Sequence, residues 1–163
     1  MRRAAMAAAV LTTSVAVALP PTASSAAAPF KGANTAAAQD DFNGDGYRDL
    51  AVGAPAAANG TVEEAGSVVV LYGSASSVTT TRRTVITQST TGIPGTAEES
   101  DRFGGTVASA DLDRDGYADL LVGASGEDVD GAESRGSVTV VWGGPDGLRD
   151  GANISLRPGT ARA

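Results

Sequence analysis

The sequence contains no cysteine and no histidine. Without cysteine no disulfide can form, so a chain exported to an oxidising compartment would need another source of stability. Without histidine, catalytic triads built on Ser-His-Asp or Cys-His are excluded, as are zinc sites with histidine or cysteine ligands. The common enzyme chemistries that remain use carboxylates alone or metal ions held by carboxylates.

Basic charge is also scarce, and Lys31 is the single lysine. The chain has 12 lysines and arginines against 19 aspartates and glutamates, which gives a formal net charge of -7. An acidic surface of this kind disfavours nucleic acids and anionic membranes as partners. It suits a protein that collects divalent cations.

The first residues have the layout of an export signal. A basic start (Met1–Arg3) precedes an apolar run (Ala4–Leu19), and three alanines (Ala26–Ala28) close the segment. This pattern predicts a secretory signal peptide over residues 1–28, cleaved near Ala28, and therefore a secreted or extracellular protein. A membrane anchor or a disordered tail is the alternative, although the run is short and rich in alanine and threonine for a membrane span.

The rest of the chain repeats itself with an offset of 70 residues. Asp41–Ala54 aligns with Asp111–Ala124 without a gap, and nine of the fourteen positions are identical. With the same offset, Gly66–Gly73 aligns with Gly136–Gly143. One offset that relates two separate blocks indicates an internal duplication.

Each repeat has the pattern of short β-strands. Apolar, β-branched runs are bounded by glycine and polar turn residues, and no stretch after the signal region has helical periodicity with caps. The second repeat predicts four strands at about 103–110, 119–124, 136–142 and 153–157, the last of them a more polar edge strand. A four-stranded antiparallel meander is one blade of a β-propeller, so the predicted fold class is all-β.

An acidic loop precedes an apolar strand in each repeat. It carries oxygen-bearing side chains at positions one, three, five and nine, a glycine at position six, and a backbone carbonyl available at position seven. Hard oxygen donors around a sharp glycine turn are typical of a short Ca²⁺-binding loop. The predicted ligands are Asp41, Asn43, Asp45, Tyr47 (through its carbonyl) and Asp49 in the first loop, and Asp111, Asp113, Asp115, Tyr117 (through its carbonyl) and Asp119 in the second.

Two other interpretations of these loops are an EF-hand and a plain turn. An EF-hand needs a glutamate at position twelve and flanking helices, whereas these loops have Val52 and Val122 there and are flanked by strands. A plain Asp/Asn/Gly turn without metal is the second alternative. Four like charges within nine residues repel one another unless something neutralises them, which favours the cation. The second loop has one more formal negative charge, so we expect it to bind Ca²⁺ more tightly.

These elements together resemble a known family. Phe103-Gly104-Gly105, the acidic loop and Gly136–Gly143 are similar to the FG-GAP repeat of the N-terminal β-propellers of integrin α-subunits and of their bacterial secreted relatives. The first copy also contains Gly53-Ala54-Pro55, the GAP element. The resemblance implies propeller blades that carry Ca²⁺ in the loop between their first and second strands.

The resemblance also suggests a domain organisation. Residues 29–39 are expected to form a linker or a degenerate first strand, 40–100 a first blade without the FG element, and 101–163 a second blade. Propellers of the family have seven blades, so we expect an incomplete propeller of about two blades, the N-terminal part of a longer one. On its own it would expose apolar sheet faces and associate, with the remaining blades or with itself.

The resemblance places ligand recognition at the end of the blades away from the acidic loops. The loops there are 55–65, 89–102 and 125–135, and their acidic side chains, Glu127 and Asp128 among them, are otherwise expected to be solvated. The predicted function is therefore a non-catalytic, calcium-binding, adhesion-like module. It would recognise an extracellular protein or glycan, without nucleic-acid binding or membrane insertion. The alternative is a scaffold portion of an extracellular hydrolase, which the absence of a nucleophile motif disfavours.

Overall fold

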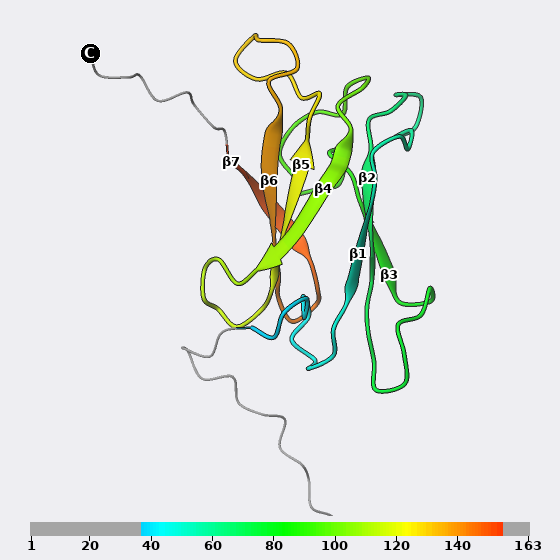
Figure 1. The fold of residues 1–163 in the computed structure, drawn as a ribbon, viewed down its shortest axis with the longest axis vertical. Coiled ribbons are helices and arrows are strands. Elements are labelled where there is room, and N and C mark those ends of the chain that lie inside the picture. The colour runs from blue at the N-terminus through cyan, green and yellow to red at the C-terminus, as the bar shows by residue number, and fades with distance from the viewer. Residues whose placement is uncertain (1–36, 155–163) are drawn as a thin grey trace, which may run out of the picture. The chain divides into compact units, whose positions relative to one another are not determined.

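The computed structural model describes residues 37–154, and these residues contain seven β-strands and no helix. The strands form two separate antiparallel sheets, of three and four strands (Figure 1). The predicted all-β class and the predicted blades are thus confirmed. The predicted signal peptide, residues 1–28, lies outside the described residues. In the described part, nothing resembles a helix long and apolar enough to cross a bilayer.

The first sheet has the order β1-β2-β3. Its strands are β1 (Leu50–Ala54), β2 (Ser67–Leu71) and β3 (Arg83–Ile86). Valine dominates β2, because β-branched side chains fit the pleated surface between two neighbouring strands. Among the described residues this sheet has three strands, and those before β1 form turns and bends.

The second sheet is a full meander of four strands. They are β4 (Phe103–Ala110), β5 (Asp119–Ala124), β6 (Ser137–Trp142) and β7 (Arg149–Ile154). The first three lie where they were predicted. The fourth begins at Arg149, four residues before the predicted start at 153, and the predicted end at 157 lies outside the described residues. The polar stretch from Arg149 to Asn153 lacks the apolar pattern of a strand, and it pairs with β6 along an exposed edge where polar residues are tolerated.

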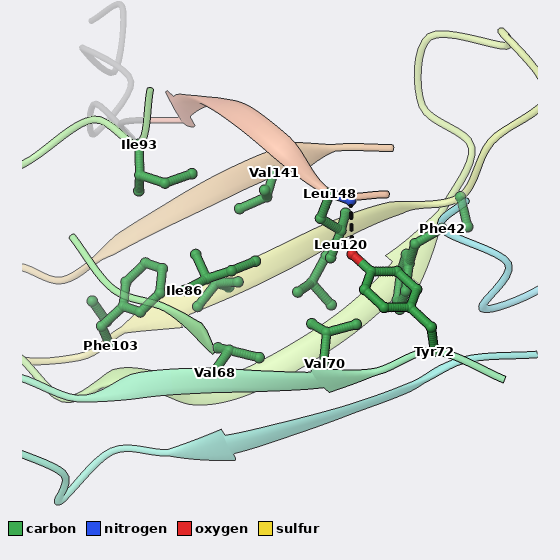
Figure 2. Packing of buried hydrophobic residues seen from close by; sticks show 13 residues of the cluster. Phe42, Val68, Val70, Tyr72, Ile86, Ile93, Phe103, Leu120, Val141 and Leu148 are labelled. Atoms are coloured by element: carbon green, nitrogen blue, oxygen red, sulfur yellow. Dashed lines mark hydrogen bonds between the residues drawn. The ribbon is translucent and has the colours of Figure 1, made fainter. Parts of the chain in front are cut away.

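The core lies between the facing sides of the two sheets. Val68, Val70 and Ile86 of the first sheet and Leu120, Val122 and Val141 of the second are all buried in one cluster with Phe103 (Figure 2). Alternation along each strand sends every second residue to this side. Tyr72 is buried in the same cluster, and its hydroxyl accepts a hydrogen bond from the Leu148 N–H at 3.1 Å.

The meander sorts the connections into two ends (Figure 1). The two acidic loops and the connections β2–β3 and β6–β7 lie at one end. The connections β1–β2, β5–β6 and β3–β4 lie at the other. The predicted cation loops and the predicted recognition loops therefore occupy opposite ends of the strands.

Candidate metal centres in the two acidic loops

Three carboxylates converge in the loop between β4 and β5. One oxygen from each of Asp111, Asp113 and Asp115 lies within 4.8 Å of the other two. Asp111 is half-buried at the end of β4, and the other two are exposed. The sequence spacing of alternate residues thus brings the predicted side chains of positions one, three and five together.

Backbone N–H groups hold this arrangement. The Gly116 N–H donates to Asp111 Oδ2 at 3.3 Å, and the Asp115 N–H donates to Asp113 Oδ1 at 3.1 Å. The Tyr117 N–H donates to Asp115 Oδ1 at 2.9 Å. Gly116 has φ +89°, a conformation that glycine adopts without steric cost, so the chain can turn sharply around the carboxylates.

The first loop reproduces these contacts one by one. The N–H groups of Gly46, Asp45 and Tyr47 donate to Asp41 Oδ2, Asn43 Oδ1 and Asp45 Oδ1, each at 3.0 Å. Gly46 again has φ +89°. Because two loops 70 residues apart share the same hydrogen bonds, the geometry belongs to the repeat rather than to one local sequence.

The aspartate at position nine ties each loop to its sheet. Asp49 accepts hydrogen bonds from the Phe42 N–H at 2.9 Å and the Gly73 N–H at 2.8 Å. Its counterpart Asp119 accepts them from the N–H groups of Leu112 at 2.8 Å and Gly143 at 3.0 Å. Burial raises the pKa of both carboxyls, and these backbone bonds lower it in part. Each oxygen keeps a second lone pair, so position nine can anchor the loop and still face a cation.

One carboxylate oxygen in each loop is buried without a partner. It is Oδ1 of Asp41 in the first loop and the equivalent Oδ1 of Asp111 in the second. A buried acceptor that lacks a hydrogen bond is costly, and native proteins rarely keep one. The same atom lacks a partner in both copies, and both loops carry further hard oxygen donors. The residues present therefore fit a hard divalent cation.

The two loops differ in charge and in neighbours. Asn43 replaces the aspartate that the second loop has at position three. Arg82 lies with Nη2 3.5 Å from Asp45 Oδ2 and also donates to the Gly73 carbonyl at 2.9 Å. At the same offset the second repeat has Ala152, and among the described residues no basic side chain forms an ion pair with the second loop.

Backbone contacts link the two loops to each other. The Ala118 N–H donates to the Asp41 carbonyl at 3.0 Å, and the Gly144 N–H donates to the Phe42 carbonyl at 3.1 Å. The Ala37 N–H reaches Asp111 Oδ2 at 2.9 Å. A change of backbone conformation in one loop would therefore disturb hydrogen bonds made by the other loop.

Sequence reasoning missed a buried polar group at the opposite end. Glu127, expected to be solvated, is only 7% exposed and accepts a hydrogen bond from Gln88 Nε2. Asp101 is also buried and accepts one from the Glu98 N–H at 2.6 Å. Burial raises the pKa of both acidic groups. No local pattern could reveal the pair, because Gln88 and Glu127 are far apart in the sequence and meet only through folding.

Two antiparallel sheets, with an acidic Asx-Gly loop leading into β1 of one and β5 of the other, define blades of the β-propeller class. The FG-GAP repeat family matches residues 33–71 and 103–141, which include both loops. The chain is accordingly an FG-GAP repeat protein.

The relatives are of two kinds. Integrin alpha-5 of Xenopus laevis is 35% identical over 113 residues, 66% of this chain and 10% of the relative. Integrin alpha-6 of Homo sapiens is 36% identical over 101 residues, 61% of this chain and 8% of the relative. Phosphatidylinositol-glycan-specific phospholipase D of Bos taurus is 31% identical over 129 residues, 78% of this chain and 15% of the relative. The chain thus spans only a small part of the length of these relatives.

Proposed function

We propose that this protein is a secreted, calcium-binding FG-GAP module that acts as a non-catalytic binding or adhesion-like domain. The observation that carries the proposal is the buried, unpartnered Oδ1 of Asp41 and of Asp111, repeated in two loops of the same geometry. The proposed ligands are the oxygens at positions one, three, five and nine, with the carbonyls of Tyr47 and Tyr117 at position seven.

Calcium in these loops would act on stability, with no part in a reaction. It would neutralise carboxylates that otherwise repel one another, and it would coordinate the buried Oδ1 atoms of Asp41 and Asp111, which have no hydrogen-bond partner. A ligand that binds only the folded state stabilises that state. In a chain without cysteine, the cation would thus take the place that disulfides have in many exported proteins.

Recognition would take place at the end away from the cation loops. The connections 55–65, 89–102 and 125–135 gather there, and residues 61–63 and 97–99 line a shallow depression between two of them. Loops on a rigid sheet scaffold are common carriers of binding residues. An extracellular protein or a glycan is the proposed partner class.

Calorimetric titration of the purified protein tests the cation sites. We expect two Ca²⁺ ions per chain, with the second loop the tighter site because it has one more carboxylate and no competing arginine. In the Asp45→Ala/Asp115→Ala double variant the heat of binding should disappear. A parent protein that gives no heat with Ca²⁺ would exclude the proposal.

We also propose that the module works as part of a longer propeller. Its support is the outer face of the first sheet, where Leu50, Val52 and Val85 are 47%, 45% and 50% exposed. Large apolar side chains on one sheet face favour a covering layer. Secretion with cleavage near Ala28 is proposed from the sequence, and the N-terminal mass of the exported product would test it.

A scaffold portion of an extracellular hydrolase is the second candidate. The similarity to a phosphatidylinositol-glycan-specific phospholipase D favours it. The purified protein should be incubated with ester, phosphodiester and glycoside substrates. Reproducible turnover that Ca²⁺-site variants do not affect would support this candidate against the binding module.

A further inference from the structure

One hydrogen bond joins the two acidic loops at their proposed ligand residues. The Ala118 N–H donates to the Asp41 carbonyl at 3.0 Å. Asp41 is position one of the first loop, and Ala118 lies between Tyr117 and Asp119, which are positions seven and nine of the second loop. The bond therefore ties the backbone of a ligand residue in one loop to the backbone between two ligand residues in the other.

A second link joins the two aspartates at position nine. Asp119 Oδ1 accepts a hydrogen bond from the Gly143 N–H at 3.0 Å, and the N–H of the next residue, Gly144, donates to the Phe42 carbonyl at 3.1 Å. The Phe42 N–H in turn donates to Asp49 Oδ2 at 2.9 Å. A continuous series of backbone groups thus connects the position-nine carboxylate of the second loop to that of the first.

The residues in these links are closely packed. Phe42 is buried, and its ring packs in the core that the two sheets share (Figure 2). Ala118 is buried in the same cluster, and a Cβ on Gly143 would lie only 2.2 Å from the Ala118 carbonyl oxygen. Close-packed segments transmit a displacement to their neighbours. The links are therefore stiff enough to carry a change from one loop to the other.

Under the proposed function, the first loop has more to gain from this contact. It has Asn43 at position three, and Arg82 already pairs with its Asp45. We expect the second loop to fill first, because it has one more carboxylate. Ordering of residues 117–119 then fixes the N–H group that holds Asp41. The first loop consequently loses less conformational freedom when it binds its own cation.

We propose that the two cation sites are coupled, so that a filled second loop raises the affinity of the first loop for Ca²⁺. This inference rests on the proposed function, since it concerns the same two sites. It makes Phe42 and Gly144, neither of which is a proposed ligand, positioning residues for the first site. Coupling between two binding sites is typically about 5-fold to 150-fold in affinity.

A calcium titration of the ¹⁵N-labelled protein, followed by NMR, measures each loop separately. The amide signals of Gly46 and Gly116 are the reporters, because each N–H donates to the position-one aspartate of its own loop. In the Asp115→Ala variant the response of Gly116 should be lost. The affinity that Gly46 reports should then fall about fivefold or more relative to the parent.

A matched pair of substitutions at Gly144 tests the second link. Gly144→Pro removes the N–H that Phe42 accepts, whereas Gly144→Ala keeps it and adds a Cβ whose nearest neighbours, from 3.2 Å, are side-chain atoms of Arg149. With Gly144→Pro, the fall caused by Asp115→Ala should shrink to about twofold, and with Gly144→Ala it should stay at about fivefold or more. The charge lost with Asp115 is the same in both comparisons, so it cannot produce the difference.

The outcomes separate this inference from the proposed function. No Ca²⁺-dependent shift at either Gly46 or Gly116 of the parent would overturn both. Shifts at both glycines, with one Gly46 affinity in the parent and in Asp115→Ala, would overturn the coupling alone. Equal falls in the Gly144→Pro and Gly144→Ala backgrounds would overturn the role of the second link. If Gly144→Pro does not fold, the comparison of the parent with Asp115→Ala still decides, in about 0.15 M salt, where charges more than about 8 Å apart are largely screened.

Discussion

At the scale of single residues, the unusual feature is a buried carboxylate oxygen that has no hydrogen-bond donor. Asp111 Oδ2 accepts two backbone N–H groups, while its Oδ1 is buried without a donor. The Asp111 carboxylate also belongs to the cluster with Asp113 and Asp115. Such a group destabilises the protein when no cation is bound. Under the proposed function the same atom would supply affinity for a cation, so stability without cation and cation binding would be opposed at this position.

Asp111→Asn should separate the two effects. The amide removes one buried negative charge and can donate to the neighbouring carboxylates, so the melting temperature without cation should rise by about 2–4 °C. The stabilisation by Ca²⁺ that comes from the second loop should be lost. Asp146→Asn, an exposed residue of the β6–β7 connection, is the control in scanning calorimetry. A lower melting temperature without cation would contradict this account.

Arg82 should weaken the first cation site. Its guanidinium pairs with Asp45 at 3.5 Å on the surface, where such a pair is worth about 0.2–1 kcal/mol. Arg82→Gln should therefore tighten Ca²⁺ binding at the first site about twofold to fivefold and leave the second site unchanged. Arg83→Gln, whose side chain makes no ion pair in the described structure, is the matched control in titration calorimetry. Equal affinities for the parent and Arg82→Gln would show that the arginine does not compete.

Glu127, at the end of the strands opposite the acidic loops, should make the stability of the fold depend on pH. Burial raises the pKa of Glu127 above its ordinary value of 4.5, and the nearby carboxyls Asp101, Glu98 and Asp128 raise it further. A raised pKa means that the folded state holds the proton more tightly. The stability from this group is thus complete below pH 4.5 and is lost as the pH rises through the raised pKa.

Glu127→Gln should therefore be more stable than the parent at pH 7, and the difference should vanish near pH 4. The glutamine keeps an oxygen for the hydrogen bond from Gln88 but cannot ionise. Thermal unfolding across this pH range measures the effect. Glu133→Gln, exposed in the same connection, should follow the parent at every pH. A variant that is less stable than the parent at pH 7 would refute the assignment.

At the scale of strands and loops, the sequence predicted what local chemistry determines. The Asp/Asn spacing and the glycine at position six predicted two loops of one geometry. Short apolar runs predicted strands β1 and β5, and runs rich in β-branched residues predicted β2 and β6. The polar strand β7 was misplaced, because its pairing with β6 replaces the missing apolar pattern. The contact of Gln88 with Glu127 was missed for a similar reason, because no local sequence pattern around either residue indicates that it is buried.

The docking of one repeat on the next predicts unequal effects for two equivalent glycines. Gly66→Ala places a Cβ against the Phe103 carbonyl, and we expect it to cost more than about 3 kcal/mol of unfolding free energy. Gly136→Ala has no such contact, so it should cost only the roughly 1–2 kcal/mol of a positive φ. Urea unfolding measures both. Equal costs would mean that Phe103 does not lie against Gly66 in solution.

At the scale of the whole molecule, the described residues form two blades that share one core. The first sheet has three strands and exposes Leu50, Val52 and Val85 on the face away from that core. Large apolar side chains on one sheet face favour a covering layer, which the proposed longer propeller would supply. The two acidic loops lie at the same end of the two blades.

The central claim is that the two acidic loops hold Ca²⁺ and thereby stabilise the fold, and one measurement tests it most directly. Thermal unfolding is recorded with excess Ca²⁺ and with EDTA, for the parent and for Asp45→Ala/Asp115→Ala. A ligand at 100 times its dissociation constant contributes about 2.7 kcal/mol per site, or about 5.4 kcal/mol for the two sites, so the parent should melt roughly 15–20 °C higher with Ca²⁺. The double variant should melt at the same temperature in both solutions. A parent protein that melts at one temperature with Ca²⁺ and with EDTA would contradict the account.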